Sequence, residues 1–538
     1  MIAGLYFFTA CNDDFMNRFP LTSVSDESYF NTVNDLRAYA NKLYEYLPGV
    51  NSGWQTDNSS DNQVPQNPPS FIWGDHFIQT AGDGWGRDDW REIRRCNYFL
   101  QRYHKATGNQ AEINRFVGEI LFFKAFQYYD KLTRYGDVPW LSSDLNLDSP
   151  ELYAARTPRN VVVDSIVENL DRAIRFLPET MLEERLSRYA ALALKSRICL
   201  FEGTFRKYHG LGNHEPMLRL AADAALQIMQ SERFSLYSTG NPETDLHSFF
   251  QLYTPEMRAS GEAIFFANYV FGLRAHNRPR EVNEARSGMS KDFARSFLMR
   301  TDGLPWALSD DYMGDDTFAD EFENRDFRMK QTIYTSDQPY YVQVDGTVTY
   351  QATPLINDFV PTGYRIYKML STRYIDREPN RAEIAQPIFR YGEVLLNYAE
   401  AKAELGEWSD EVMNQTINLL RARAGMPHMQ NPIPFVDPNW PDWEVPVTPL
   451  INEIRRERRV ELATEGFRFN DLRRWKAGKL LDNPETYLGA RNPDTGQYHR
   501  PYTDRIRPAW HDKLYLWPIP SGQIQLNPAL TQNPGWTQ

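Results

Sequence analysis

The sequence predicts a mainly α-helical protein, in which a scaffold of stacked helix pairs carries a loop-rich insertion with short strands and hairpins. Two observations support this fold class. Apolar residues recur at helical spacing through residues 26–235 and again through 387–480. Between these blocks, residues 240–385 contain short apolar or alternating runs of strand length, separated by stretches that carry Pro and Asn. Residues 481–538 form a C-terminal segment.

The first helical block contains several helices with clear boundaries. An apolar stripe at helical spacing covers residues 116–132. A later helix starts at Thr157-Pro158, where Thr can act as the N-cap and Pro can occupy the first turn. Two further helices, each rich in Ala on one side, are predicted over 188–203 and 215–230.

The second helical block predicts one helix pair joined by a tight turn. Residues 387–426 read as a helix, a turn at Gly406, and a second helix that Ser409 caps and Pro427 follows. A helix, a short Gly turn, a second helix and a Pro make one unit of a tetratricopeptide array. Because such a pair cannot bury its apolar face alone, the sequence predicts a scaffold of about four tetratricopeptide-like pairs.

The insertion between the blocks contains the strand signals. The run EAIFFANYVF, residues 262–271, is continuously apolar and of strand length. The run YYVQVDGTVTYQ, residues 340–351, alternates on both sides of Asp345-Gly346, which predicts a hairpin. A second irregular stretch, 431–449, is rich in Pro and Trp. Binding residues are often found on such loops, which a rigid scaffold holds in place.

Length, charge and composition narrow the class of protein. The 538 residues suffice for two or three ordinary domains or for one large core with insertions. The net charge of −12 argues against a nucleic acid as partner, because no basic surface is expected to hold phosphates. Aromatic residues make up 14% of the chain, and apolar rings with a polar edge stack well on sugars. Large cores also use aromatic residues, so this excess alone leaves both interpretations open.

The two internal cysteines are predicted to be buried free thiols. Cys96 and Cys199 each lie on the apolar side of a predicted helix, where a thiol packs as a small apolar group. A disulfide between them is the alternative, and it would require the two residues to be close in space.

The start of the chain resembles a lipoprotein signal. A short apolar run, residues 2–10, ends in small residues directly before Cys11. We expect cleavage after a signal peptide spanning 1–10, a lipid on Cys11, and an extended tether over 11–25. Two features depart from the usual pattern: Phe8 stands where Leu is common, and no basic residue precedes the run. A basic stretch upstream of Met1 would explain the second departure, and a Cys placed there by chance is the alternative.

A row of glutamates raises the question of catalysis. Glu457, Glu461 and Glu465 are spaced i, i+4, i+8 and share one face of a predicted helix. Several arginines are within reach of this face: Arg455, Arg458, Arg459 and Arg468. A paired acid and base would need one carboxyl group that stays protonated, whereas dense Arg keeps carboxylates ionised. We therefore predict a lattice of ion pairs rather than a catalytic site.

Other catalytic and metal patterns are missing from the sequence. GxSxG and HExxH do not occur, and the 9 His residues are scattered. The acidic stretch 309–320 could bind Ca²⁺ through its carboxylates, but it lacks the ligand spacing of a calcium loop, which favours a solvated loop. We predict that the protein is not an enzyme and has neither catalytic residues nor a resident metal or cofactor.

Loop tryptophans are the candidates for ligand contact. Trp54, Trp73 and Trp85 lie in a stretch that is otherwise poor in apolar residues and rich in Asn and Gln, which can hydrogen-bond sugar hydroxyl groups. Isolated tryptophans in such loops have little core to join. Lower-ranked aromatic candidates lie in later loops: Trp306, Tyr312, Trp440 and Trp443. The alternative is that each Trp holds its own loop against the scaffold.

Several segments resemble one known family. LINEIRRERRVELATEGFRFNDLRRW, residues 450–475, and YLWPIPSGQIQLNPALTQNPGW, residues 515–536, resemble the C-terminal signatures of the SusD/RagB family of surface glycan-binding lipoproteins. Earlier segments resemble its other motifs in the same order, from CNDDFMNRFP through SKDFARSFLMRTDGLP to PIFRYGEVLLNYAEAKAELG. The resemblance therefore spans nearly the whole chain.

This resemblance implies a single tetratricopeptide-supported domain over 26–538 and an outer-membrane lipid anchor at Cys11 that faces the cell surface. It also implies that a glycan is bound without being chemically changed and is delivered to a SusC-type TonB-dependent transporter. Asp13-Asp14 resembles the surface-export signal of such lipoproteins. Alternatives are a tetratricopeptide-type module for a peptide or protein ligand and a peptide-importing member of the same family. An anchored glycan hydrolase is disfavoured because no isolated carboxylate pair is present.

Overall fold

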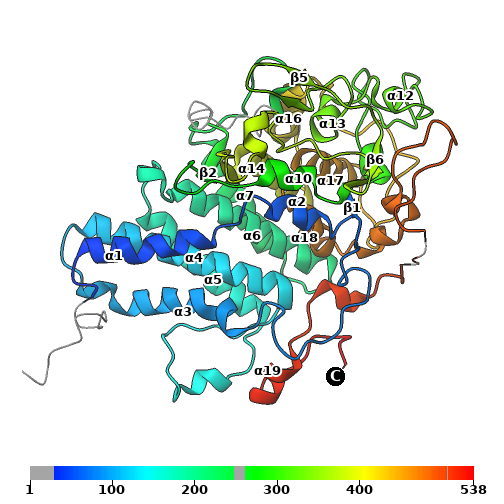
Figure 1. Cartoon of the computed structure of the whole chain (residues 1–538). Helices are drawn as coiled ribbons and strands as arrows, with labels where there is room; N and C mark the ends of the chain where they lie inside the picture. Colours follow the sequence, from blue (N-terminus) through cyan, green and yellow to red (C-terminus); the bar gives the residue numbers. More distant parts are fainter. Residues whose placement is uncertain (1–28, 247–260, 504, 506, 538) are drawn as a thin grey trace, which may run out of the picture.

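The structure is a computed structural model that describes residues 29–246, 261–503, 505 and 507–537. The predicted signal peptide, the lipid attachment at Cys11, the tether and the Asp13-Asp14 pair lie outside these residues. Figure 1 shows the helical scaffold on one side of the molecule and the insertion packed above it.

A stack of helices forms the scaffold. Its helices are α1 (Val33–Asn41), α3 (Arg87–Arg102), α4 (Gln110–Tyr135), α5 (Arg159–Phe176), α6 (Arg188–Tyr208), α7 (Glu215–Met229) and α14 (Tyr391–Glu404). From α3 to α7 each helix packs on the next one along the chain, and α7 then packs on α14 across the insertion (Figure 1). The predicted mainly α, tetratricopeptide-like fold class is confirmed.

Local chemistry explains where these helices begin and end. Asn109 caps α4 by accepting hydrogen bonds from the backbone N–H groups of Ala111 and Glu112, and Gly136 ends the helix at φ 72°. The helix that starts near Thr157 differs from the prediction. Pro158 occupies the N-cap of α5, while the Thr157 hydroxyl accepts a hydrogen bond from the Trp140 backbone N–H 3.1 Å away.

The second helix pair is confirmed with one change. The Ser409 hydroxyl accepts a hydrogen bond from the Val412 backbone N–H, as expected for a cap. The helix that follows is broken at Thr416 (φ −132°, ψ −88°) into α15 (Asp410–Gln415) and α16 (Ile417–Arg423).

The insertion contains short two-stranded ladders. The predicted apolar strand is β2 (Ala263–Ala267), and it pairs antiparallel with β8 (Gln386–Arg390), so the two ends of the insertion meet. The predicted hairpin forms between β4 (Tyr341–Val342) and β5 (Val348–Thr349), with Gly346 at φ 87°. Two further ladders pair β1 (Gln63–Pro65) with β3 (Ser287–Met289) and β6 (Leu355–Asn357) with β7 (Val360–Gly363).

Short helices connect these parts. They are α2 (Ser52–Asp57), α10 (Arg278–Asn283), α11 (Lys291–Arg295), α12 (Phe318–Phe322), α13 (Phe327–Thr332), α18 (Arg468–Arg474) and α19 (Ser521–Leu526). The longer α17 (Pro449–Leu462) carries the glutamate row and is buried along most of its length. It packs on α14 of the scaffold and on α13 of the insertion, and it therefore joins the two parts.

Cys96 and Cys199 are buried free thiols, as predicted, and the alternative of a disulfide between them is wrong. Burial raises the pKa of the Cys199 thiol to about 12. A search of the described residues for a helix of membrane-spanning length and apolarity found none.

Candidate functional site

The glutamate row forms a buried lattice of ion pairs, as predicted. Arg328 Nη1 lies 2.6 Å from Glu457 Oε1, Arg390 Nη1 lies 2.8 Å from Glu461 Oε1, and Lys368 Nζ lies 2.7 Å from Glu465 Oε1. Two further arginines join the set, since Arg421 pairs with Glu457 and Arg423 pairs with Glu461. Asp326, which pairs with Arg328, and Glu262, which pairs with Arg390 and Arg423, bring the carboxylates to five against five cations. We call this set the α17 lattice.

The partners of the lattice differ from those predicted. Of the four nearby arginines, Arg458 pairs with Asp471, while Arg459 and Arg468 pair with Asp61. Arg455 lies among the rings of Tyr208, Trp443 and Trp475. Glu465 follows the end of α17 and reaches the lattice because the chain turns at Thr464 (φ 65°). The true partners come from segments distant in sequence, which spacing along one helix could not reveal.

The lattice keeps its carboxyl groups ionised. Burial alone would raise the pKa of Glu461, but Arg423, Arg390 and Arg328 outweigh burial and lower the pKa below its usual value. The pKa values of Glu457 and Glu465 are also lowered, because neighbouring cations outweigh burial there too. A general acid must keep its proton near neutral pH, so these groups are unsuited to that role.

The premise that Trp54, Trp73 and Trp85 have little core to join is wrong. Their exposed fractions are 6%, 4% and 5%. Trp73 packs edge-on against Tyr487 and Tyr502, with ring centroids 5.4 and 5.0 Å away. The rings that cover these tryptophans come mainly from distant parts of the chain. Ligand contact by the three residues stays a prediction. Each ring is nevertheless packed inside the protein, as expected from the alternative in which each Trp holds its own loop against the scaffold.

Trp85 and Trp54 illustrate the same point. The ring of Trp85 meets that of Tyr135 edge-on at 4.7 Å and that of Trp90 at 5.4 Å. The indole N–H of Trp54 donates a hydrogen bond to Asn51 Oδ1 at 3.1 Å, and its ring joins an apolar cluster whose members come mostly from the insertion.

The lower-ranked aromatic candidates gather around one cavity. Trp306, Trp440 and Trp443 line a cavity of about 610 Å³, which we call the tryptophan cavity. Trp306 and Trp440 are half-buried, so part of each ring remains accessible. Tyr312 lies beside this cavity, with its ring 5.2 Å from that of Trp306. The structure therefore brings together residues that are more than 100 positions apart in the chain.

Polar groups share the walls of the tryptophan cavity. Asn439 and Asp442 are exposed at the loop that carries Trp440. The guanidinium of Arg295, which also lines the cavity, lies 5.1 Å from the Trp306 ring and pairs with Glu485. The segment 479–485 was not predicted to take part, because nothing in its sequence distinguishes it from an ordinary surface loop.

Arg455 fixes the floor of this cavity. Its side chain is 1% exposed, and its guanidinium carbon lies 4.5 Å from the ring centroids of both Trp443 and Trp475. The indole N–H of Trp443 donates a hydrogen bond to Asn452 Oδ1 at 3.0 Å. Cation–π contacts of this kind are stronger when the cation is desolvated. Trp443 is thus held rigidly, while Trp440 and Trp306 present the accessible rings.

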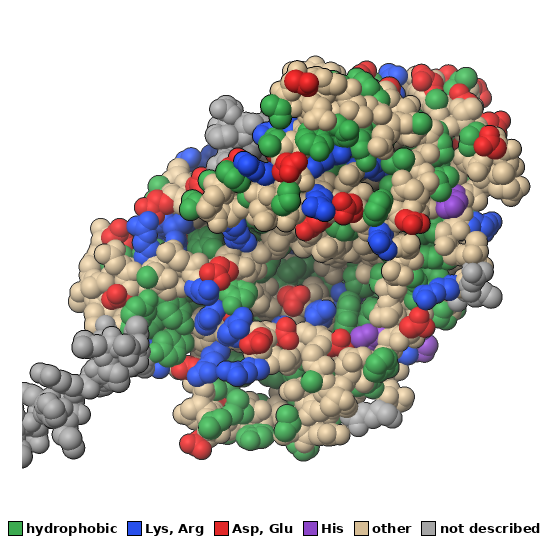
Figure 2. All heavy atoms as spheres, viewed as in Figure 1, with side chains coloured by type: hydrophobic (Ala, Val, Ile, Leu, Met, Phe, Trp, Pro, Cys, Tyr) green, Lys and Arg blue, Asp and Glu red, His purple; other side chains and the backbone are tan. Residues whose placement is uncertain are grey.

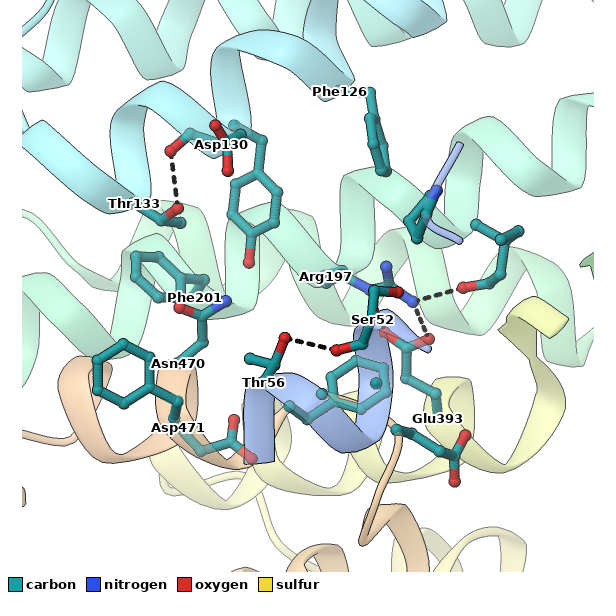
Figure 3. Close-up of a pocket in the computed structure, with 18 of the residues that line it drawn as sticks. Ser52, Thr56, Phe126, Asp130, Thr133, Arg197, Phe201, Glu393, Asn470 and Asp471 are labelled. Atoms are coloured by element: carbon teal, nitrogen blue, oxygen red, sulfur yellow. Dashed lines mark hydrogen bonds and ion pairs between the residues drawn. The ribbon is translucent and has the colours of Figure 1, made fainter. Parts of the chain in front are cut away.

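A second cavity, of about 760 Å³, lies between the scaffold and the helices docked onto it. We call it the interhelical cavity. Figure 3 shows Phe126 on α4, Phe201 on α6, Thr56 on α2 and Asn470 on α18 around it. In Figure 2 the surface is hollowed where α2, α6 and α18 lie in Figure 1. None of its lining residues was a candidate for ligand contact in the sequence, because its walls come from six separate parts of the chain: 46–59, 126–134, 197–201, 386–393, 458–474 and Trp517.

The acidic stretch 309–320 uses several of its carboxylates within the protein. Asp315 pairs with Lys291 at 2.6 Å, Asp316 pairs with Arg491, and Asp320 accepts from the Thr317 hydroxyl at the start of α12. Across the described residues, no group of three or more His, Cys, Asp or Glu side chains is arranged to hold a metal ion.

Comparison with known proteins gives consistent matches. A model of the SusD family matches residues 266–536, and a model described as starch-binding associating with outer membrane matches residues 21–200. The SusD-like protein P2 of Formosa agariphila is 22% identical, and the alignment covers 99% of this chain and 98% of the relative.

Solved structures match over a similar extent. A SusD-like protein from Bacteroides fragilis is 25% identical with a TM-score of 0.75, and the match covers 96% of this chain and 100% of that one. A SusD-like carbohydrate binding protein from the same species is 20% identical with a TM-score of 0.69, over 93% of this chain and 99% of that one.

Proposed function

The chain belongs to the SusD family, and we propose that it binds a glycan in the tryptophan cavity without changing it chemically. The observation that carries this proposal is the meeting of Trp306, Trp440 and Trp443 around one cavity. A solved SusD-like relative is described as carbohydrate binding, which supports the same class of ligand.

The chemistry of the cavity suits a sugar. Half-buried indole rings offer an apolar face for stacking, and the C–H face of a sugar ring fits such a surface. Asn439 and Asp442 beside Trp440 can exchange hydrogen bonds with hydroxyl groups, since an amide both donates and accepts and a carboxylate accepts. A cavity of about 610 Å³ has the size of ordinary small-ligand sites.

The wider biological role also belongs to the proposal. The family description associates such proteins with the outer membrane, and we infer attachment there through a lipid on Cys11, with the folded body facing outward. Delivery of the glycan to a SusC-type TonB-dependent transporter follows from the family resemblance. Copurification of a transporter with the tagged protein from outer membranes tests this part, and recovery of the protein without any transporter would contradict it.

Absence of catalysis is supported by the charge pattern. The glutamates of the α17 lattice are buried among cations, so they are poor candidates for proton transfer. Turnover of any polysaccharide by the purified protein would contradict this part of the proposal.

Gel retardation tests the proposed site directly. The protein from Asn12 onward is run through gels that contain plant, host or microbial polysaccharides. We expect at least one polysaccharide to retard it, and we expect Trp440→Ala and Trp306→Ala each to weaken retardation by roughly ten-fold in affinity, because stacking on an exposed ring is lost.

The matched control is Trp408→Ala, which removes a half-buried indole in the turn between α14 and α15, where it lines neither cavity. Variants of Trp54, Trp73 and Trp85 are included to test their predicted ligand contact, with circular dichroism to report loss of folding. Retardation that persists in both Trp440→Ala and Trp306→Ala would rule out the tryptophan cavity. Absence of retardation with every polysaccharide would favour a peptide ligand instead.

A further inference from the structure

The interhelical cavity has an excess of positive charge. Arginines outnumber carboxylates in its walls: Arg134, Arg197, Arg390, Arg458, Arg473 and Arg474 face Asp130, Glu393, Glu465 and Asp471. Most of these groups neutralise one another. Arg197 pairs with Glu393 at 2.6 Å, Arg390 pairs with Glu465 at 2.7 Å, and both Arg458 and Arg474 pair with Asp471. Arg134 and Arg473 have no partner among these carboxylates, and Asp130 lies 3.6 Å from Lys131 instead.

Arg473 is a buried cation that has only neutral hydrogen-bond acceptors. Its side chain is 2% exposed, and its guanidinium donates to the backbone oxygens of Tyr515 and Thr133 and to Asn470 Oδ1. Burial lowers the pKa of Arg473 to about 9, and repulsion from Arg159 and Arg134 adds to this effect. A buried charge without a counter-charge raises the free energy of the folded protein, so a nearby negative charge would be favourable here.

The guanidinium of Arg134 has hydrogen-bond donors that are not used within the described protein. Its Nη1 donates to the backbone oxygen of Asp83 at 3.1 Å, and the part of the chain that the structure describes gives it no further hydrogen bond and no ion pair. Its Nε and Nη2 groups are therefore available to a ligand. Gly84 makes room for this guanidinium, because a Cβ at that position would overlap Nη1. Gly84 also has φ of +81°, which further favours glycine there.

Trp517 places an aromatic ring beside the two cations. The guanidinium carbons of Arg134 and Arg473 lie 5.2 and 4.8 Å from the centroid of its half-buried ring. Phe71 stacks on the ring at 3.8 Å, and the backbone N–H of Trp517 donates to the Arg134 carbonyl at 2.7 Å, so the ring is held firmly. Asn470 and Asp130, which Figure 3 shows on opposite sides of the cavity, add polar groups nearby.

From this arrangement we propose that the interhelical cavity is a second binding site, which takes an anionic group of an acidic saccharide at Arg134, Arg473 and Trp517. Guanidinium groups prefer ligands of this kind, because the oxygens of a planar carboxylate or of a tetrahedral sulfate ester accept charge-assisted hydrogen bonds. Trp517 would contact the sugar ring that carries the charge. The inference rests on the proposed function only in taking the ligand to be a saccharide.

The test compares charged and neutral sugars of one size by titration calorimetry. The probes are trigalacturonate, its carboxyl-reduced form, and a trisaccharide of sulfated galactose. We expect at least one of the two charged probes to bind at least ten-fold more tightly than the reduced probe, because a charge-assisted hydrogen bond to a partly buried guanidinium is lost with the charge. Affinity for that probe should fall as salt rises.

Arg134→Gln is the informative variant, since Arg134 is half-buried and its removal leaves no carboxylate unpaired. We expect it to weaken binding of the charged probe about ten-fold and to leave the reduced probe unaffected. The matched control, Arg219→Gln, removes an exposed arginine that pairs with Glu407 on the scaffold, and it should bind like wild type.

Three results would overturn the inference: no binding of either charged probe, equal binding of charged and reduced probes, or unchanged affinity in Arg134→Gln. Trp440→Ala separates this failure from failure of the proposed function. If Trp440→Ala loses the polysaccharide found by gel retardation but keeps the charged probe, both sites stand. If Arg134→Gln alone loses its ligand while Trp440→Ala and Trp306→Ala bind every glycan normally, the second site stands and the first fails.

Discussion

The scaffold and helix α17 are both buried, yet the scaffold helices bury mainly apolar side chains, whereas α17 buries mainly polar and charged ones. Helices α4, α6 and α14 pack through Ala, Leu, Ile and Phe in one continuous apolar cluster. By contrast, α17 buries a row of charged groups that pair with α13, β8, α16 and Lys368. Apolar faces accept many neighbours of suitable shape, whereas a buried carboxylate needs one particular cation. We infer that the scaffold supplies bulk stability and that the α17 lattice fixes where the insertion sits.

This difference matters for the two cavities. Arg455, Arg456 and Arg459 of α17 line the tryptophan cavity, and Glu465, just beyond the helix, lines the interhelical one. A helix that is positioned by paired charges therefore contributes walls to both sites. Rigid walls preserve the spacing between Trp440 and Trp306 and between Arg134 and Trp517, which limits the entropy lost when a ligand binds.

The strongest test of the comparison breaks the lattice. Glu461→Gln removes the charge that Arg390, Arg423 and Arg328 share. We expect the free energy of unfolding to fall by about 4 kcal/mol, because cations are left buried without a partner. Urea unfolding followed by circular dichroism measures the change. Glu407→Gln, in a partly exposed pair with Arg219, is the control and should cost less than about 1 kcal/mol. If Glu461→Gln also lowered the free energy of unfolding by less than about 1 kcal/mol, the lattice would contribute little to the stability of the fold.

The next test breaks the scaffold instead. Leu395 is fully buried in α14, and Leu395→Ala should lower the free energy of unfolding by about 3 kcal/mol, through lost burial and the cavity left behind. The scaffold effect involves no charge, so it should be the same at pH 7 and pH 5 and in low or high salt. A clear dependence of this loss on pH, measured in the same urea experiment, would show that the two regions are not independent.

Acid should weaken the lattice, and it should also weaken the ion pair of Glu400 on α14 with Arg474, which lowers the pKa of that carboxyl group against the effect of burial. The apolar contacts of the scaffold should not respond to acid. The folded-state pKa of Glu461 lies below its unfolded value of about 4.3, so its contribution to stability is present above that pH and is lost as pH falls toward the folded value. Glu457 and Glu465 are shifted in the same direction. Below pH about 4.3 we expect up to about 1.4 kcal/mol of stability to be lost per pH unit for each such carboxyl group.

Glu461→Gln sharpens this measurement. With one shifted carboxyl group removed, unfolding free energies measured between pH 5 and pH 3 should fall less steeply than those of wild type, while Leu395→Ala should follow the wild-type slope. Equal slopes for wild type and Glu461→Gln would contradict the assignment of acid sensitivity to the lattice.

The same contrast explains what could be predicted from the sequence. Helix boundaries depend on neighbours along the chain, so Ser409 and the 116–132 stripe were sufficient to place α15 and α4. Contacts between distant segments leave no such local sign. The burial of Trp73 depends on Tyr487 and Tyr502, more than 400 positions later, and a loop that is poor in apolar residues gave no hint of them.

The spatial neighbours of the candidate residues could not be predicted for the same reason. The glutamate spacing correctly indicated ion pairs, but Arg328, Arg390 and Lys368 were out of reach of any pattern within the helix. Trp306 and Trp440 were ranked below the N-terminal tryptophans, because the residues next to them in the sequence do not indicate that both line one cavity. The interhelical cavity was missed altogether, since its walls meet only after α2 and α18 dock on α4 and α6.

The smallest expected effect separates ligand contact from structural support. Trp306 is half-buried, and it touches Tyr312 and Arg295 rather than a closed core. Trp306→Ala should therefore lower the free energy of unfolding by only about 1 kcal/mol, since surface substitutions outside tightly packed regions cost little. Urea unfolding measures this value beside the binding loss seen in gels. A loss of about 4 kcal/mol would place Trp306 with the buried tryptophans, and weaker glycan binding in the variant would then report damage to the fold rather than a missing contact.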